Sequence, residues 1–360
     1  MTQRERLVNT ILGGPVDHPS LPYWLGFVPW GDTLERWRRE SGIRDLDVQV
    51  CFDMDPWFDV VPLEWGPFPR FDDTVIGGDD EFVVSRDYRG ITLRNRRDGA
   101  SMPEWIRHPV ACREDWERYR AERLSGPLEE RCTALASFVR AARTRDAAIQ
   151  VGTFPWGVFG TLRDLMGAEG CLLAFYDDPG LVREIIDTYA DLWLALWERA
   201  AIELPVDHVH IWEDMSGRQG SLISMAMVEE FMLPSYDRFV AFARGHGVRI
   251  VSVDTDGACE ELVEAMSARG INAFMPFEVQ AGNDVEAFRR RYPRLGIMGG
   301  LDKTALAAGR GRINAELAKA ERMLASGAYL AGFDHAIPPD VPWEGYRYAM
   351  TELRRIMGRA

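Results

Sequence analysis

Eight short apolar runs, separated by segments of helical periodicity, constrain the fold of this chain more than any other feature. Short β-branched apolar runs are typical of buried strands, and helices between them join such strands into a parallel sheet. The pattern predicts an α/β fold, a (β/α)8 TIM barrel, with strands at residues 21–27, 48–55, 147–154, 206–214, 249–257, 271–278, 295–303 and 328–335.

Residues 58–100 differ from the rest of the chain in their turn chemistry. Two strand-like runs there are bounded by turn pairs at 77–78 and 98–99, a spacing typical of hairpins. We therefore expect a small antiparallel β excursion near residues 58–100 that covers one end of a single barrel domain, residues 1–360. The alternative is an open doubly wound sheet, but no Gly-x-Gly-x-x-Gly follows the first predicted strand to support it.

The overall charge and the cysteine pattern limit the partners of the chain. Its net charge of −14 disfavours nucleic acid, because phosphate binding needs a basic surface. The five cysteines are scattered without a CxxC pair, as expected of reduced thiols. The N-terminal residues lack the apolar segment of a signal peptide, and no run approaches the ~18 apolar residues of a membrane span. We expect a cytoplasmic protein that binds neither nucleic acid nor membranes.

Two aspartates follow the apolar run that begins at Arg249. Asp254 and Asp256 are two positions apart, and side chains with that spacing on an extended chain point to the same side. The two carboxylates are therefore expected to converge just past the end of a buried strand. The alternative is that Asp256 or Gly257 caps the helix predicted over residues 258–269.

Polar residues stand at the carboxyl end of almost every predicted strand. In a barrel of this type the active site lies on that face and draws residues from several strand ends. Glu213 and His335 are therefore candidates for catalysis together with Asp254 and Asp256. The predicted substrate-binding residues are Tyr23, Trp24, Asp53, Trp156, Glu278 and Asp302.

His208 and His210 form a second pair with a spacing of two, in the strand that precedes Glu213. Paired histidines can bind a metal ion. Because both lie early in the strand, away from its carboxyl end, ordinary polar packing is the favoured interpretation.

Several short motifs resemble those of the uroporphyrinogen decarboxylase superfamily. They are Gly-Ala-Tyr-Leu-Ala-Gly-Phe-Asp-His-Ala-Ile-Pro-Pro-Asp at 327–340, Gly-Gly-Leu-Asp-Lys at 299–303, Val-Asp-Thr-Asp-Gly at 253–257 and Trp-Glu-Asp at 212–214. The resemblance covers nearly the whole chain. It implies a (β/α)8 barrel with a cleft at the carboxyl face of the strands.

One branch of that superfamily decarboxylates porphyrinogens without a cofactor, using paired arginines in an early loop, an aspartate and a tyrosine. Residues 28–32 of this chain contain no arginine pair. Asp53 or Asp55 corresponds to the family aspartate, and His335 to a late histidine of the family.

The other branch contains zinc-dependent methyltransferases that pass methyl groups between a thiol and a corrinoid protein. Their His-x-Cys-Gly motif corresponds here to Asp254-Thr-Asp256-Gly257, and their late cysteine to His335. The resemblance thus implies that Asp254, Asp256 and His335 hold a divalent metal such as zinc as a Lewis acid, although harder cations become competitive with carboxylate ligands. Glu213 or Glu278 would be a fourth ligand or the general acid.

The leading functional hypothesis is a metal-assisted methyltransferase or demethylase that acts on a small molecule, with a corrinoid protein as methyl acceptor. The alternative is a cofactor-free decarboxylase, a lyase with Asp53, Asp254 and His335 as proton donors. A third reading is a binding barrel without catalysis, since a barrel fold by itself fixes no function. A homodimer is compatible with each of them.

Overall fold

Seven parallel strands form the main sheet of the computed structural model, which describes residues 1–97 and 102–359. Apart from the first edge strand, every residue of these strands is buried or nearly so, as expected of a parallel sheet covered on both faces. From edge to edge the order is β1 (Asp59–Val60), β6 (Ile149–Val151), β7 (His208–Trp212), β10 (Ile250–Thr255), β11 (Ala273–Pro276), β12 (Gly296–Met298) and β13 (Tyr329–Leu330).

The sheet is curled into a half-barrel, and the first predicted strand is not a regular strand. Pro22 makes an isolated parallel bridge with Asp55 near one edge of the sheet. The Trp24 indole N–H donates to the carbonyl of Ala331 at 3.4 Å near the other edge. Proline has no backbone N–H to donate to a ladder, so the segment makes single contacts and a 3-10 turn, η1 (Leu25–Phe27), where an eighth strand was expected.

The second predicted strand, residues 48–55, is wrong, because the segment begins with a short helix, α3 (Val48–Cys51). The side chain of Asp47 accepts a hydrogen bond from the backbone N–H of Val50 at 3.1 Å and caps this helix. Val50 is 75% exposed while the apolar side chains two positions before and after it are buried, so the run is one turn of amphipathic helix. Its place in the sheet is taken by β1.

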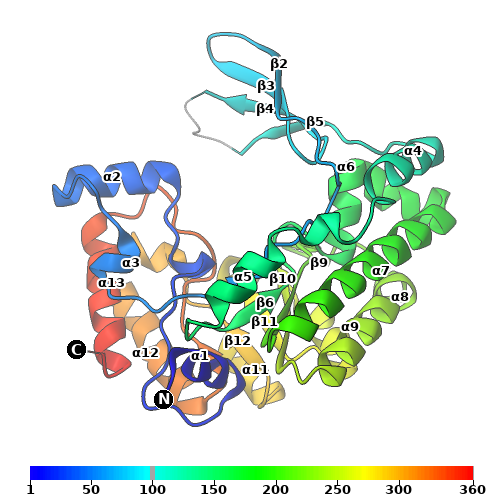
Figure 1. The fold of residues 1–360 in the computed structure, drawn as a ribbon. Coiled ribbons are helices and arrows are strands. Elements are labelled where there is room, and N and C mark those ends of the chain that lie inside the picture. The colour runs from blue at the N-terminus through cyan, green and yellow to red at the C-terminus, as the bar shows by residue number, and fades with distance from the viewer. Residues whose placement is uncertain (98–101, 360) are drawn as a thin grey trace.

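Helices surround the outside of the curled sheet (Figure 1). Within the described ranges none is both long and apolar enough to cross a membrane, and all five cysteines are free thiols. Residues 225–245 form α8 (Met225–Met227), a π-helical turn η3 (Val228–Met232) and α9 (Leu233–Gly245). The others are α1 (Gln3–Leu12), α2 (Gly31–Ser41), α4 (Arg113–Arg123), α5 (Leu135–Ala142), α6 (Val158–Asp177), α7 (Pro179–Glu203), α10 (Glu260–Arg269), α11 (Val285–Arg291), α12 (Arg310–Ser326) and α13 (Trp343–Ile356).

The antiparallel excursion is a four-stranded sheet that projects from one side of the half-barrel (Figure 1). It starts later than predicted, because residues 59–60 belong to the main sheet, and positions 98–100 of the predicted range lie outside the described residues. Its strands, in order, are β2 (Thr74–Gly78), β3 (Phe82–Arg86), β4 (Thr92–Arg96) and β5 (Glu104–Arg107).

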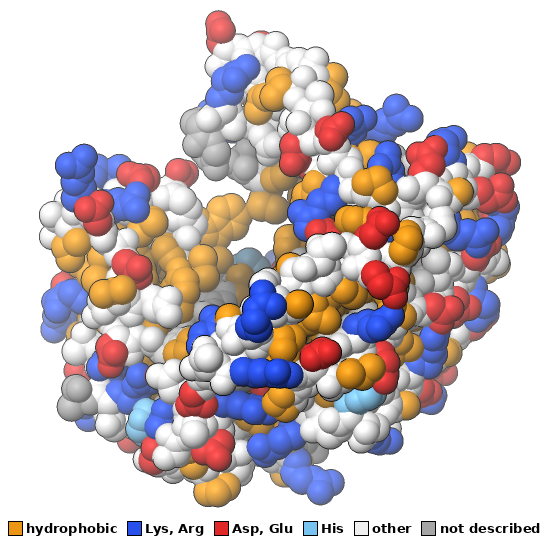
Figure 2. All heavy atoms as spheres, viewed as in Figure 1, with side chains coloured by type: hydrophobic (Ala, Val, Ile, Leu, Met, Phe, Trp, Pro, Cys, Tyr) orange, Lys and Arg blue, Asp and Glu red, His pale blue; other side chains and the backbone are white. Residues whose placement is uncertain are grey.

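Figure 2 shows a deep hollow between the lobe that contains α2, the antiparallel sheet and the opposite lobe that contains α6 and α7. Many of the side chains on its walls are hydrophobic. A hollow of this width gives a large ligand or a second protein access to the molecule.

The start of α6 lies unusually close to β7. A Cβ atom at Gly157, the residue before α6, would lie 1.8 Å from the carbonyl oxygen of Trp212, and one at Gly160 would lie 2.6 Å from the same oxygen. Only hydrogen atoms fit in that space, so glycine at these two positions lets the helix begin directly against the strand.

We therefore expect Gly157→Ala to lower the free energy of unfolding by about 1–3 kcal/mol, because the added methyl group forces the helix away from the strand. The matched control is Gly311→Ala in α12, where no described atom lies within 4 Å of the added Cβ. That change should stabilise the helix by roughly 0.5–1 kcal/mol. Urea unfolding of the three proteins measures both effects, and equal stabilities would show that the close approach is not constrained.

Candidate active site

The lower part of the half-barrel interior is filled by a histidine pair. His208 and His210 on β7 both lie against the hydroxyl of Ser252 on β10, at 2.6 Å from Nε2 and 3.0 Å from Nδ1. Burial lowers the pKa of both imidazoles, that of His210 to about 4. Both are therefore neutral near pH 7 and belong to the packed interior, as the sequence pattern favoured.

Asp254 lies one level higher, on the same interior face as Ser252, because residues two apart on a strand share a face. It pairs with Trp212 across the β7–β10 ladder and is only 7% exposed. Burial raises the pKa of its carboxyl group well above the usual value, and the neighbouring charges of Asp256 and Asp214 raise it further. Burial therefore favours the neutral, protonated form of Asp254, which can donate a proton.

Asp256 and His335 form an ion pair beside this acid. The His335 Nε2 and Asp256 Oδ2 atoms are 3.6 Å apart, and the two side chains are 28% and 32% exposed. Burial by itself lowers the pKa of His335, but the carboxylate of Asp256 outweighs it, so the pKa is raised. The imidazole therefore keeps its proton to a higher pH than it would without Asp256.

Two further groups connect the neighbouring strand ends. The Lys303 ammonium lies 3.6 Å from Glu278 and 3.4 Å from the fully buried Asp334, and the second oxygen of Glu278 accepts from the backbone N–H of Gly257 at 3.0 Å. These contacts tie the loops after β10, β11, β12 and β13 together, so that the acid groups keep their positions.

Asp214, at the end of β7, lies next to Asp254 and Asp256 and adds a further carboxylate to the site. Its carboxylate accepts a hydrogen bond from Arg163 of α6 at 2.6 Å. Burial raises the pKa of Asp214, Arg163 opposes that rise, and Asp256 adds to it. Four side chains are therefore electrostatically coupled across the carboxyl edges of β7, β10 and β13: Asp214, Asp254, Asp256 and His335. We call these four residues the acid group.

The predicted metal ligands Asp254, Asp256 and His335 do meet at this edge, but not as a metal-binding group. Among the residues that the structure describes, no set of three or more His, Cys, Asp or Glu side chains is arranged to hold a metal ion. Instead, His335 pairs with Asp256, and Asp254 is held as a neutral acid. As arranged, these side chains do not fit a metal ion.

Glu213, which was predicted to take part in catalysis, lies against α6 with its side chain fully buried. Its carboxylate accepts hydrogen bonds from Tyr236 at 2.7 Å and from the first three backbone N–H groups of α6, those of residues 158–160, at 2.6–3.2 Å. Burial raises the pKa of Glu213 to about 7 against these donors, which lower it. Glu213 is thus a helix cap, and it faces away from the hollow.

Asp53 and Asp302 lie outside the group formed by Asp214, Asp254, Asp256 and His335. Asp53 is 85% exposed at its side chain and faces Arg354 and Arg359 near the C-terminus. Asp302 is buried. Its carboxylate accepts hydrogen bonds from the backbone N–H and the hydroxyl of Thr304, so that Asp302 caps a 3-10 turn. Both side chains thus make local contacts, and neither touches the acid group.

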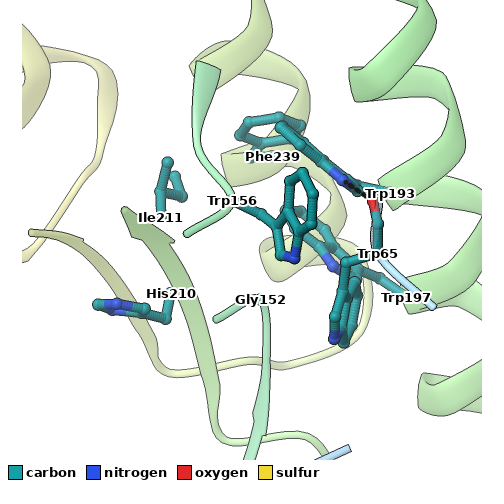
Figure 3. A pocket seen from close by; sticks show the side chains of 8 residues that line it. All are labelled: Trp65, Gly152, Trp156, Trp193, Trp197, His210, Ile211 and Phe239. Carbon is teal, nitrogen blue, oxygen red and sulfur yellow. Dashed lines mark hydrogen bonds between the residues drawn. The ribbon is translucent and has the colours of Figure 1, made fainter. Parts of the chain in front are cut away.

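The predicted aromatic wall residues are part of the core. Trp24 is 4% exposed and stacks on Trp57 with ring centroids 5.9 Å apart, and Tyr23 beside it is half-buried. Trp156 is buried and closes a cavity of only about 10 Å³ with three further tryptophans (Figure 3). A space of that size holds at most one water molecule. One edge of Trp156 also borders a groove of about 230 Å³ outside the core.

Three residues of this site were not selected from the sequence: Asp214, Lys303 and Arg163. Strict alternation from His210 and Trp212 places Asp214, and not Glu213, on the interior face. That signal was present in the sequence. Arg163 had no comparable signal, because it reaches Asp214 from the second turn of a helix.

The comparison with family models bears on this geometry directly. The model described as uroporphyrinogen decarboxylase (URO-D) matches residues 83–356, which is more than half of the chain. The chain belongs to the uroporphyrinogen decarboxylase family. This URO-D family member has no match among curated proteins.

Solved structures agree on the fold of this family member. A methyltransferase from Methanosarcina mazei is similar over 99% of this chain and 98% of its own, with a TM-score of 0.56 and 14% sequence identity. An intracellular xylanase from Thermoanaerobacterium saccharolyticum is similar over 58% of this chain and 72% of its own, with 11% identity. Its TM-score of 0.31 is too low to support an argument. At these identities the first likeness shows the fold alone.

We expect Glu213→Ala to destabilise the protein by about 3 kcal/mol, because it leaves the buried N–H groups of α6 and the Tyr236 hydroxyl without an acceptor. Glu229→Ala, on the exposed side of η3, is the control and should leave stability unchanged within about 0.5 kcal/mol. Thermal unfolding compares the three proteins. Unchanged stability of Glu213→Ala would contradict the capping role.

We expect Asp256→Asn to lower the pKa of His335, because the neutral amide no longer opposes the effect of burial. An NMR titration of the imidazole signals measures this, and with six histidines in the chain a His335→Gln protein assigns the signal. The resonance of His246 on the outer face serves as an internal control. A His335 titration that does not move would mean that the ion pair does not form in solution.

Proposed function

We propose that this URO-D family member is a demethylating methyltransferase for a small molecule that is not an anion, with Asp254 as the proton donor to the leaving group. Its single strongest support is the buried, neutral carboxyl group of Asp254 on the interior face at the end of β10. The fold shared with a methyltransferase is consistent with this chemistry.

The proposed reaction breaks the bond between a methyl group and an oxygen or nitrogen atom of the substrate. The methyl group passes to a nucleophile, and the atom left behind takes the proton of Asp254. A neutral acid suits this task, because it can protonate the leaving group as the bond breaks. Asp256 and the charged His335 next to it would then stabilise the site as Asp254 becomes a carboxylate and supply a proton to restore it.

The nucleophile is proposed to be a reduced corrinoid carried by a partner protein. The hollow in Figure 2 is consistent with this, because a flat cofactor on a second protein needs a wide approach to the strand ends. The residues of this chain would bind the methyl donor at the base of that hollow, orient its methyl group outward, and protonate the remainder.

The charge pattern favours methyl transfer over decarboxylation of a polyanion. The three cations at this edge are already paired: Arg163 with Asp214, Lys303 with Glu278 and Asp334, and His335 with Asp256. Binding several substrate carboxylates would require cations that are free to pair with them. Carboxylates outnumber cations here, so a neutral or positively charged substrate fits the site better.

The test uses free cob(I)alamin as methyl acceptor and a panel of neutral methyl ethers and methylamines under anaerobic conditions. We expect loss of the cob(I)alamin absorption with at least one donor, and a drop of about 100-fold or more in Asp254→Asn, as is typical when a general acid is removed. Activity should fall as pH rises through the raised pKa of Asp254, because only the protonated form donates.

The control is Asp53→Asn, which changes an exposed carboxylate far from the acid group and should keep full activity. Release of CO2 from carboxylated compounds, without methyl transfer to cob(I)alamin, would replace this proposal by the decarboxylase alternative. Elemental analysis of the purified protein tests the metal-assisted form. One tightly held divalent ion per chain, lost in Asp254→Asn, would require the side chains to rearrange around it.

A further inference from the structure

A large cavity lies between β5 of the antiparallel sheet and the first half of α6. Its volume is about 880 Å³, which is within the range of small-molecule sites, roughly 300–1,000 Å³. It is lined by residues of five segments of the chain: Arg89, residues 102–108 around β5, Phe154, residues 163–170 of α6, and the end of β7. None of these lining residues belongs to the acid group except Asp214.

The walls of this cavity carry exposed apolar side chains. Met102 is 59% exposed, Trp105 46% and Phe154 63%, and all three face the same space together with Trp212. The rings of Phe154 and Trp212 meet edge to face, with centroids 4.7 Å apart. Large apolar side chains that converge on one concave surface mark a binding site, because a ligand removes them from water.

Among the described residues that line the cavity, both arginines are already paired with carboxylates. Arg89 lies 2.6 Å from Asp164 and 2.8 Å from Asp87, and Arg163 lies 2.6 Å from Asp214. Two more carboxylates, at positions 104 and 169, face the same space. An anion would therefore meet net negative charge, and a neutral ligand fits better.

His108 provides a directional polar contact. Its Nδ1 lies 2.8 Å from the backbone carbonyl of Asp164, and a carbonyl only accepts, so Nδ1 carries the proton. In the neutral ring Nε2 is then an acceptor. The ring lies over a glycine break in α6: Gly167 has φ +75°, and a Cβ there would lie 2.8 Å from the His108 ring. The helix is thus interrupted where the imidazole fits.

The cavity borders the candidate active site at the end of β7. Trp212 lines the cavity and pairs with Asp254 in the ladder. The backbone N–H of Asp214 donates to the carbonyl of Asp254 at 3.1 Å, and its side chain borders the cavity. A ligand bound between Trp105 and Trp212 therefore has one end close to the buried acid.

We propose that this cavity binds the non-reacting part of the substrate, and that this part is a neutral aromatic ring system bearing a hydroxyl or N–H donor to His108. The aromatic side chains contact the ring, His108 accepts the donor hydrogen, and the paired arginines exclude carboxylated analogues. The inference rests on the proposed function for the reaction of the bound molecule, but not for its binding.

Calorimetric titration of the full chain with three related probes tests this assignment. 2-Naphthol should bind, 2-methoxynaphthalene should bind about tenfold more weakly because it lacks the donor, and 2-naphthoate should bind at least about tenfold more weakly because of its charge. If 2-naphthoate binds as tightly as 2-naphthol, or if none of the three probes binds, the assignment is wrong.

Variants locate the binding. Trp105→Ala and Phe154→Ala change exposed side chains and should each weaken 2-naphthol binding by about tenfold, whereas His108→Phe should remove the preference for 2-naphthol over its methyl ether. The control is Tyr176→Ala, an aromatic residue that is 73% exposed near the end of α6 and outside the cavity. Wild-type affinity in both Trp105→Ala and Phe154→Ala would place the probe elsewhere.

Binding and reaction are separated with Asp254→Asn. This protein should bind 2-naphthol as the wild type does, because Asp254 does not line the cavity. Probe binding without methyl transfer from any aromatic ether would overturn the proposed function and leave the cavity assignment intact. Methyl transfer that persists unchanged in Trp105→Ala and Phe154→Ala would overturn the cavity assignment alone.

Discussion

The buried carboxylate of Glu213 joins the three elements on which the candidate site depends. It extends from the end of β7, accepts the free N–H groups at the start of α6, and is held by Tyr236 of α9. An uncompensated carboxylate in this position would be very costly, and its four donors remove most of that cost. The same contacts fix the direction of Trp212 and Asp214 on either side of it.

This arrangement also explains why α6 begins where it does. Gly157 and Gly160 allow the first turn to touch the carbonyl of Trp212, and the first turn then brings Arg163 to Asp214. The acid edge and the side cavity are consequently built by one contact between a strand and a helix. A displacement of α6 would open the cavity, free Arg163 and change the charge around Asp254 together.

Much of the parallel sheet could be predicted from the sequence, because buried strands are short and β-branched. The runs that contain Val209, Val251 and Phe274 are strands at the predicted places. The run at Val48 was misread because four residues of apolar character fit one turn of a helix as well as a strand, and the cap at Asp47 decides between them. The first run is not a strand, because Pro22 near its start has no N–H to donate to a ladder and the residues after it form a 3-10 turn.

Part of the candidate site could also be predicted from the spacing of its residues and from the family resemblance. Spacing correctly placed Asp254 and Asp256 at one strand end, and the family resemblance brought His335 to them. Alternation from His210 and Trp212 also places Asp214 on the interior face and Glu213 on the opposite one, but only the burial of Glu213 in the structure reveals its role as a helix cap. Spacing could not place Arg163 or His108, whose positions depend on where a helix starts and where it is broken by Gly167.

The neutral state of Asp254 follows from this same packing, and it sets what the site can do. Asp214, Asp256 and Asp254 share a small volume, and three negative charges there would repel one another strongly. Arg163 and His335 compensate the two outer carboxylates, while the inner one, with no cation beside it, retains its proton. A proton that is kept on a buried acid by its neighbours is available to a leaving group that approaches from the hollow. In the function proposed above, the aromatic wall beside Trp212 would hold the rest of such a molecule, and the cavity and the acid would form two halves of one substrate site.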